Sequence, residues 1–165
     1  MTIPPNDSVL AGASRASATY GLANSTWARI APLCISLALY TLACLSPALV
    51  FSSVNGQQVM PGFWVLAIGW LGPLYDQFAW FANPFLFLGM LALLFRKWIA
   101  AIVLVVVSLA IAADILLLFS QQVPADEGGV NQLTLQYLDF GFYFWIASIL
   151  VVGVAALVLW TIDRR

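Results

Sequence analysis

Three stretches of the chain are long, apolar and nearly free of charge. They are residues 30–51, 98–119 and 140–162, and Asp114 is the single Asp, Glu, Lys or Arg among them. A helix rises about 1.5 Å per residue, so about 20 apolar residues cross a hydrocarbon layer of about 30 Å. A chain that is 63% hydrophobic and 8% charged also cannot cover a water-facing surface. The sequence therefore predicts an integral membrane protein.

A fourth apolar region, residues 63–95, is too long for one ordinary span and too short for two spans joined by a turn. Gly72 and Pro73 interrupt it, and a helix is disfavoured at the residue before a proline. We predict a short outer segment at residues 63–71, either interfacial or re-entrant, followed by a true span at residues 74–95.

Together these segments predict an all-α integral membrane protein. Its fold would be a four-transmembrane-helix bundle with the short outer segment before the second span. The bundle would occupy residues 29–165 as one domain. Residues 1–28 are polar and rich in small side chains, so we expect a flexible tail there.

The basic residues predict the orientation in the membrane. With four spans, all of them fall on one side: Arg15, Arg29, Arg96, Lys97, Arg164 and Arg165. The two opposite connections, residues 52–62 and 120–138, contain no Lys or Arg. Cytoplasmic loops carry the excess of Lys and Arg in membrane proteins, so we expect both termini in the cytoplasm. The strictness of the pattern and the small size of the chain favour a bacterial inner membrane.

Composition argues against several classes of function. The chain has no histidine, which removes the commonest metal ligand and the commonest general base. Cys34 and Cys44 are ten residues apart, which on a helix is about 15 Å and too far for a disulfide. The net charge of −1 offers no basic face to nucleic acid. We therefore expect no metal, no cofactor, no nucleic-acid partner and no enzymatic activity.

Asp114 is the most informative polar residue, because a carboxyl group inside a membrane is costly unless it is paired, hydrated or protonated. On a helix, Gln121 lies about two turns above it on the same side. Asp76 and Asn83 recur at seven-residue spacing, so they would share one face of the second span. These groups either join helices by hydrogen bonds or form a site for a proton, a cation or a partner.

Two further positions have local structural interpretations. Pro84 follows Asn83 within the predicted second span, and it should free a backbone carbonyl near Trp80 and bend the helix. Asp139 stands at the outer start of the fourth span, where it is expected to cap the helix. It is also an acidic candidate for the same outer site, since no basic residue is predicted on that side.

Small and polar residues mark two helix faces. Ser36, Tyr40 and Cys44 recur every four residues on the first span, and Gly153 and Ala156 lie in the middle of the fourth. In lipid, helices associate by close packing rather than by hydrophobicity, and small residues permit that packing. We interpret both faces as helix–helix contacts, within the chain or with the helix of a partner.

No nucleophile–base pair or phosphate-binding loop is evident. The leading hypothesis is therefore a non-enzymatic membrane protein that acts through protein–protein contacts. It would be an accessory subunit of a membrane complex or a small immunity-type protein, surrounded by lipid and bound to another membrane protein or to copies of itself. The alternative is a small proton- or cation-linked channel or transporter that uses an intramembrane Asp site.

Overall fold

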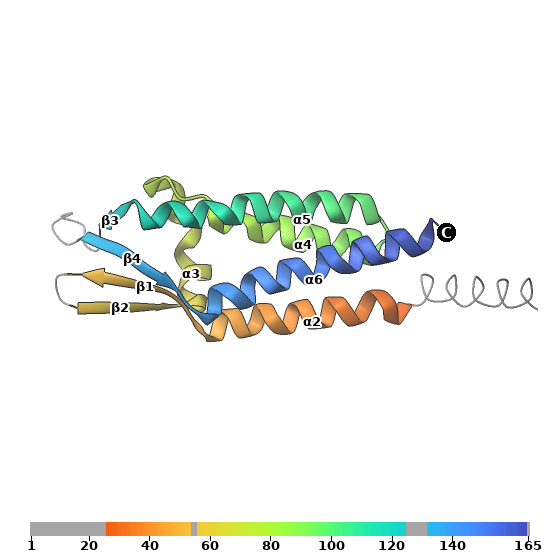
Figure 1. Cartoon of the computed structure of the whole chain (residues 1–165), viewed down its shortest axis with the longest axis horizontal. Helices are drawn as coiled ribbons and strands as arrows, with labels where there is room; N and C mark the ends of the chain where they lie inside the picture. The colour runs from red at the N-terminus through yellow and green to blue at the C-terminus, as the bar shows by residue number, and fades with distance from the viewer. Residues whose placement is uncertain (1–25, 54–55, 125–131, 165) are drawn as a thin grey trace, which may run out of the picture.

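The computed structural model describes residues 26–53, 56–124 and 132–164. In this part of the chain, helical segments run side by side and a small sheet extends from one end of them (Figure 1). Three helices are long and apolar enough to cross a membrane. They are α2 (Thr26–Leu45), the continuous pair α5 (Trp98–Ala112) and η3 (Ala113–Phe119), and α6 (Phe140–Asp163).

The outward surface of these helices supports contact with lipid. The side chains of Ile99, Val103 and Val106 on α5 are each more than half exposed. A helix in water would place polar residues on such a face. The membrane prediction is therefore supported by the distribution of side chains as well as by their average hydropathy.

Only part of the predicted second span, residues 74–95, forms an α-helix. It contains a turn of 3-10 helix, η2 (Ala79–Phe81), and then α4 (Ala82–Leu94). The 13 residues of α4 extend about 20 Å, which is less than the hydrocarbon thickness. The prediction was too long at its N-terminal end, because the chain turns at residues 76–78.

The segment before η2 is helical but short. It consists of α3 (Gly62–Ile68) and the 3-10 helix η1 (Gly69–Tyr75), and neither contains a fully buried residue. Figure 1 shows α3 crossing between the helices where the sheet begins, rather than running along them. The segment predicted at residues 63–71 is therefore made of α3 and the start of η1.

The prediction of an all-α fold was wrong, because both expected outer loops contribute strands. Antiparallel pairing gives the order β2-β1-β4-β3. The strands are β1 (Pro47–Ser53), β2 (Gly56–Pro61), β3 (Gln122–Pro124) and β4 (Gln132–Leu138). Figure 1 shows the sheet continuing the direction of α2 and α6 beyond the helices.

The boundary between α2 and β1 corrects the predicted first span, residues 30–51. The helix ends at Leu45, two residues before Pro47, since a proline disfavours the helical conformation of the residue before it. The apolar residues that follow enter the sheet, where Val50 is 1% exposed. An apolar run alone does not distinguish a buried strand from the end of a helix.

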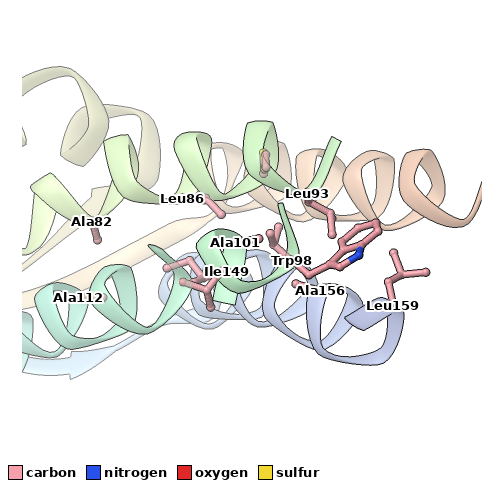
Figure 2. Packing of buried hydrophobic residues seen from close by; sticks show 12 residues of the cluster. Ala82, Leu86, Leu93, Trp98, Ala101, Ala112, Ile149, Ala156 and Leu159 are labelled. Atoms are coloured by element: carbon pink, nitrogen blue, oxygen red, sulfur yellow. The ribbon is translucent and has the colours of Figure 1, made fainter. Parts of the chain in front are cut away.

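Two hydrophobic clusters hold the structure together. The larger fills the space between α4, α5 and α6 (Figure 2), and includes Leu86, Ala101, Ile149 and Ala156, all completely buried. The smaller lies between the sheet and η3, where Leu49 and Leu135 pack near Ile115. The sheet is therefore anchored to the helices through this smaller cluster.

Candidate functional site

Asn83 connects three helices at the sheet end of the bundle. Its Oδ1 atom accepts a hydrogen bond from Tyr40 Oη of α2 at 3.2 Å and another from Trp145 Nε1 of α6 at 2.9 Å. Its Nδ2 atom donates to the carbonyl oxygen of Trp80 at 2.8 Å. Asn83 is buried, so each of these bonds offsets the loss of water around a polar group.

Pro84 explains one of these contacts and corrects a prediction. It lies in the first turn of α4, where a backbone N–H has no partner within the helix, so it does not bend a long span as we expected. The carbonyl of Trp80, four residues earlier, is the oxygen that an N–H at position 84 would have bonded. The side chain of Asn83 satisfies that oxygen instead.

A cavity of about 70 Å³ adjoins this network. It is surrounded by residues of α2, α3, α4 and α6 and by β1, and Tyr40, Asn83 and Trp145 are the polar groups that join helices in its wall. Cys44, the third member of the predicted α2 face, also lines it. The volume of the cavity is well below the several hundred cubic ångströms of typical ligand sites.

Serine residues make similar links along the helices. Ser36, the first member of the α2 face, is fully buried and donates to the carbonyl oxygen of Ser148 on α6 at 2.6 Å. Ser108 of α5 is also fully buried and donates to the carbonyl of Ala82 at 2.9 Å. The hydroxyl groups of Ser36 and Ser108 therefore serve contacts between helices.

Asp114 lies at the start of η3 and faces the turn that precedes η2. Its Oδ2 atom accepts a 2.6 Å hydrogen bond from the backbone N–H of Phe78. Nearby in the same two segments, the side chain of Gln77 donates to Oε1 of Gln121. Asp114 thus connects the sheet end of the α5–η3 helix to the chain that leads into α4. It does not line the cavity.

Asp76 does not share a helical face with Asn83, contrary to our prediction. It ends η1 in the left-handed conformation, with φ of 55°, and its side chain is exposed. Non-glycine residues adopt this conformation uncommonly, and Asp is among those that tolerate it. The turn at Asp76 separates η1 from η2, so the seven-residue spacing does not bring the two side chains onto one surface.

Asp139 is the N-cap residue of α6. Its Oδ1 atom accepts from the backbone N–H of Phe140 at 2.7 Å, and its own N–H donates to the carbonyl of Ala48 in β1 at 2.9 Å. Within the described residues, Asp139 and Asp114 each accept a hydrogen bond from a different backbone amide, that of Phe140 and that of Phe78. Asp76, Asp114 and Asp139 therefore have separate local surroundings rather than one shared cluster of contacts.

The small residues of α6 lie where the helices pack closely. Ala156 is completely buried in the larger hydrophobic cluster. A Cβ atom placed on Gly153 would lie 2.8 Å from a methyl carbon of Val105 on α5. These two positions allow α5 and α6 to approach each other.

The outer edge of the sheet carries a second candidate site. Strand β2 pairs only with β1 in the described sheet, so its other side is an edge. A groove of about 320 Å³ lies between the β1–β2 pair and α3, and is lined by Phe51, Gln58, Val59, Met60, Pro61, Trp64 and Ile68. Val59 is 56% exposed and Trp64 is 50% exposed. This groove is larger than the internal cavity and contains no charged side chain.

Sequence reasoning missed two features of these sites. Trp145 was not singled out from the sequence, and its indole donates to Asn83 between helices. The strands were missed although residues 132–138 alternate between polar and apolar types, a pattern typical of a half-buried strand. This alternation could have predicted β4 from the sequence.

Comparison with known proteins identifies no relative: no protein-family model, curated protein or solved structure matches the chain.

Proposed function

We propose that the chain is a four-span membrane protein that acts through protein–protein contacts made by its outer sheet. In this arrangement α2, η2 with α4, α5 with η3, and α6 are the four spans. Both termini lie in the cytoplasm of a bacterial cell, and the sheet projects from the opposite face of the inner membrane.

The arrangement of charges supports this orientation. Arg29 bonds the carbonyl of Leu94, and Arg96 pairs with Asp163, so basic residues from distant parts of the chain meet at one end of the helices. The described strands contain no Lys or Arg. The positive-inside rule then assigns the basic end to the cytoplasm.

The short second span is compatible with a membrane at modest cost. Together η2 and α4 cover residues 79–94, which is about 24 Å of helix at the α-helical rise. A bilayer adjusts to a short span by local thinning. The packing of α4 against α5 and α6 in the larger cluster holds it in the bundle.

The contacts of Asn83 and Asp114 favour a structural role over transport. Asn83 has three hydrogen bonds to other residues, and Asp114 accepts a short bond from a backbone N–H. A transport site for protons or cations needs oxygen atoms that remain available to the transported ion. The partner hypothesis therefore has more support than the channel hypothesis.

The edge of β2 carries the functional proposal. Exposed edge strands pair readily with other chains, and proteins usually protect them with charged residues, internal prolines or very short length. The sequence of β2, GQQVMP, has no charge and has proline only at its last position. The opposite edge strand, β3, has only three residues. The β2 edge is thus the less protected of the two.

The groove beside β2 supports recognition of an extended segment. In β-strand addition, backbone hydrogen bonds supply affinity and pockets for alternate side chains supply specificity. The exposed apolar side chains in the lining of the groove, Val59, Trp64 and Ile68, are available to such side chains. We therefore expect an uncharged, partly apolar segment of another protein.

A second copy in the same membrane is a poorer match for this edge. The strands run in the direction of the helices, so two copies with the same orientation present β2 in the same direction (Figure 1). Antiparallel self-pairing would require one copy to be inverted in the membrane. Parallel pairing is slightly less stable per residue.

Site-specific photo-crosslinking in the native host membrane tests the proposal. A benzoylphenylalanine introduced at Gln58 should give one discrete protein adduct, and the adduct peptide should map to an extended, uncharged segment. The same group at Gln122 on β3 is the matched control and should give little adduct. Val59→Lys should strongly reduce the adduct, because a charged side chain on an edge opposes strand pairing.

Three outcomes of that experiment would count against the proposal. They are adducts with lipid only, equal adducts from both edges, and adduct formation that Val59→Lys leaves unchanged. An adduct between two copies of this chain would show that the β2 edge binds a second copy rather than a different protein.

A further inference from the structure

The end of the bundle opposite the sheet gathers basic residues from three elements. Arg29 belongs to α2, Arg96 and Lys97 form the turn between α4 and α5, and Arg164 follows α6. Among the described residues at this end, Asp163 is the only acid. Four positive charges and one negative charge leave a local excess of three positive charges.

Arg96 occupies an unusual backbone conformation, with φ of 60°. The N–H of Lys97 donates to the carbonyl of Ala92 at 2.8 Å, and the N–H of Arg96 donates to Leu93 at 3.2 Å. This pattern is a Schellman motif, in which glycine usually occupies the left-handed position because other residues are strained there. Arg96 therefore keeps a charge at a position where glycine would fit the backbone better.

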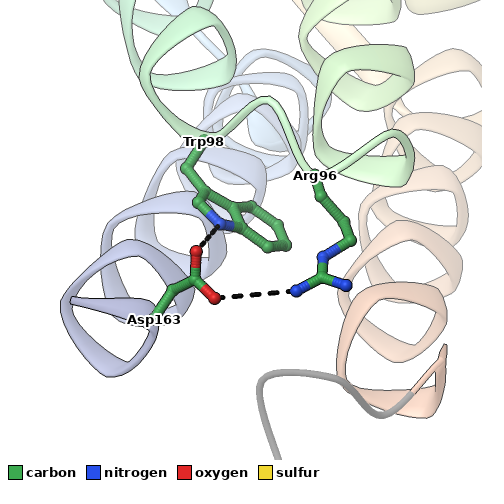
Figure 3. A network of polar contacts seen from close by, with 3 residues as sticks. All are labelled: Arg96, Trp98 and Asp163. Atoms are coloured by element: carbon green, nitrogen blue, oxygen red, sulfur yellow. Dashed lines mark hydrogen bonds and ion pairs between the residues drawn. The ribbon is translucent and has the colours of Figure 1, made fainter. Parts of the chain in front are cut away.

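Asp163 orients this turn. One of its oxygens lies 3.6 Å from Nη2 of Arg96, and the other accepts from Nε1 of Trp98 at 3.1 Å (Figure 3). The ion pair is nearly half exposed, so Arg96 retains donors that face away from Asp163. Asp163 thus contacts both Arg96 and Trp98 and neutralises part of the charge of Arg96.

Arg29 adds a second guanidinium close to the same turn. Its Nη1 donates to the carbonyl of Leu94 at 2.8 Å, near the end of α4. Its Nε atom is buried and has no hydrogen-bond partner among the described residues. A buried donor without a partner is uncommon in native structures, and a bound water or an anionic oxygen would satisfy it.

Large apolar side chains surround these charges. Trp27 is 77% exposed, Phe95 is 65% exposed and Ile99 is 59% exposed, and each is within two or three residues of a basic residue. The surface thus combines cationic donors with an apolar border. A phospholipid has the matching chemistry, since its phosphate meets the donors while its acyl chains cover the apolar side chains.

We propose that Arg29, Arg96 and Lys97 form a binding site for the headgroup of an anionic phospholipid at this end of the bundle. The excess positive charge favours a lipid with a net negative charge over a zwitterionic one. The strain at Arg96 is retained because the guanidinium contacts the lipid phosphate. This site is independent of the partner-binding edge of β2, which lies at the other end of the molecule (Figure 1).

Native mass spectrometry of the full chain in mild detergent tests the site. The probes are phosphatidylglycerol and phosphatidylcholine with identical acyl chains. The wild-type protein should bind phosphatidylglycerol more tightly. Arg96→Gly should reduce that preference about fivefold, the effect expected for one basic residue near an anionic lipid. Glycine suits the left-handed position, so this variant should fold at least as well as the wild-type protein.

Three variants and one competitor distinguish the site from a structural role. Arg96→Lys keeps the charge and should retain most of the preference, whereas Asp163→Asn frees Arg96 and should increase it about fivefold. Arg96→Gln removes the charge without the backbone freedom of glycine, and it should reduce the preference as Arg96→Gly does. Millimolar glycerol phosphate, which lacks acyl chains, should not displace the lipid.

The proposal is overturned if Arg96→Gly and Arg96→Gln both leave the preference unchanged. It is also overturned if the wild-type protein binds the two lipids equally, or if Asp163→Asn weakens binding of phosphatidylglycerol. Displacement by glycerol phosphate would assign the site to a soluble phosphate compound instead of a lipid.

Discussion

Asn83 Oδ1 accepts a 2.9 Å hydrogen bond from the indole Nε1 of Trp145, and this bond joins α4 to α6 across 62 positions of the chain. The same oxygen accepts from Tyr40 on α2. One amide group therefore makes polar contacts with three helices: its own α4, and α2 and α6 through Tyr40 and Trp145. These contacts lead to a prediction about the stability of the bundle.

Asn83→Leu should lower the free energy of unfolding by roughly 2 kcal/mol, because the indole of Trp145 and the hydroxyl of Tyr40 lose their partner and the carbonyl of Trp80 loses one of its donors. Tyr40→Phe removes only one bond and should cost about 0.6 kcal/mol. Unfolding of the purified protein by a denaturing detergent measures both values. Equal stability of Asn83→Leu and the wild-type protein would show that the three contacts do not stabilise the bundle.

Asp114 should tolerate an amide but not an apolar side chain. Asp114→Asn retains an oxygen for the N–H of Phe78, so it should lose about 1 kcal/mol, the difference between a charge-assisted and a neutral hydrogen bond. Asp114→Leu leaves that N–H without its partner and should lose about 2 kcal/mol or more. The same unfolding assay compares the two variants.

Flux measurements on Asp114→Asn separate the two functional hypotheses. Proteoliposomes with the wild-type protein and with this variant should show equal, background movement of protons and cations. A wild-type flux that disappears in a stably folded Asp114→Asn variant would support the channel hypothesis and contradict the structural role.

The glycines should differ sharply in their tolerance of alanine. A Cβ atom at Gly62 would lie 2.0 Å from the backbone oxygen of Ala43, so Gly62→Ala should destabilise the protein by about 3 kcal/mol or prevent its folding. Gly89→Ala is the control, since its Cβ would meet no atom closer than 3.6 Å and alanine favours a helix by up to about 1 kcal/mol. Expression level and thermal unfolding of the two variants test this difference in stability. The prediction is wrong if Gly62→Ala and Gly89→Ala are equally stable.

Cysteine labelling tests the proposed topology. In a background with Cys34 and Cys44 replaced by Ala, Gln122→Cys should react with a membrane-impermeant maleimide on spheroplasts. Lys97→Cys should react only after the membrane is permeabilised, because it lies at the basic end of the helices. Labelling of both positions without permeabilisation would contradict four spans with cytoplasmic termini.

Some elements of this fold follow from short stretches of sequence. The helix over Phe140–Asp163 was predicted to within one residue, and the helix from Trp98 to Phe119 has the predicted ends. Both are continuous apolar segments with polar or charged residues at their limits. A helix forms its hydrogen bonds within its own segment, so local hydropathy and length are sufficient to locate it.

The strands and the contacts of the candidate sites depended on distant segments. Residues 47–51 are as apolar as the membrane-spanning helix that precedes them. They form a strand because β4, more than 80 residues later, supplies hydrogen-bond partners for them. Asp76 and Asn83 have the spacing of one helical face, but the turn at residues 76–78 separates them. No local pattern predicted that Trp145 would bond Asn83.

By itself, the sequence determined that the chain has apolar helices long enough to cross a membrane, since hydropathy and length depend on neighbouring residues. The packing of the helices brings the described basic residues Arg29, Arg96, Lys97 and Arg164 to one end of them. Only the tertiary structure decided that the opposite end carries a four-stranded sheet with an unprotected edge. It also decided that Asn83 serves three helices and that Arg96 is held in a strained turn beside Asp163. These features require hydrogen bonds and ion pairs between residues far apart in the chain, which hydropathy and spacing do not encode.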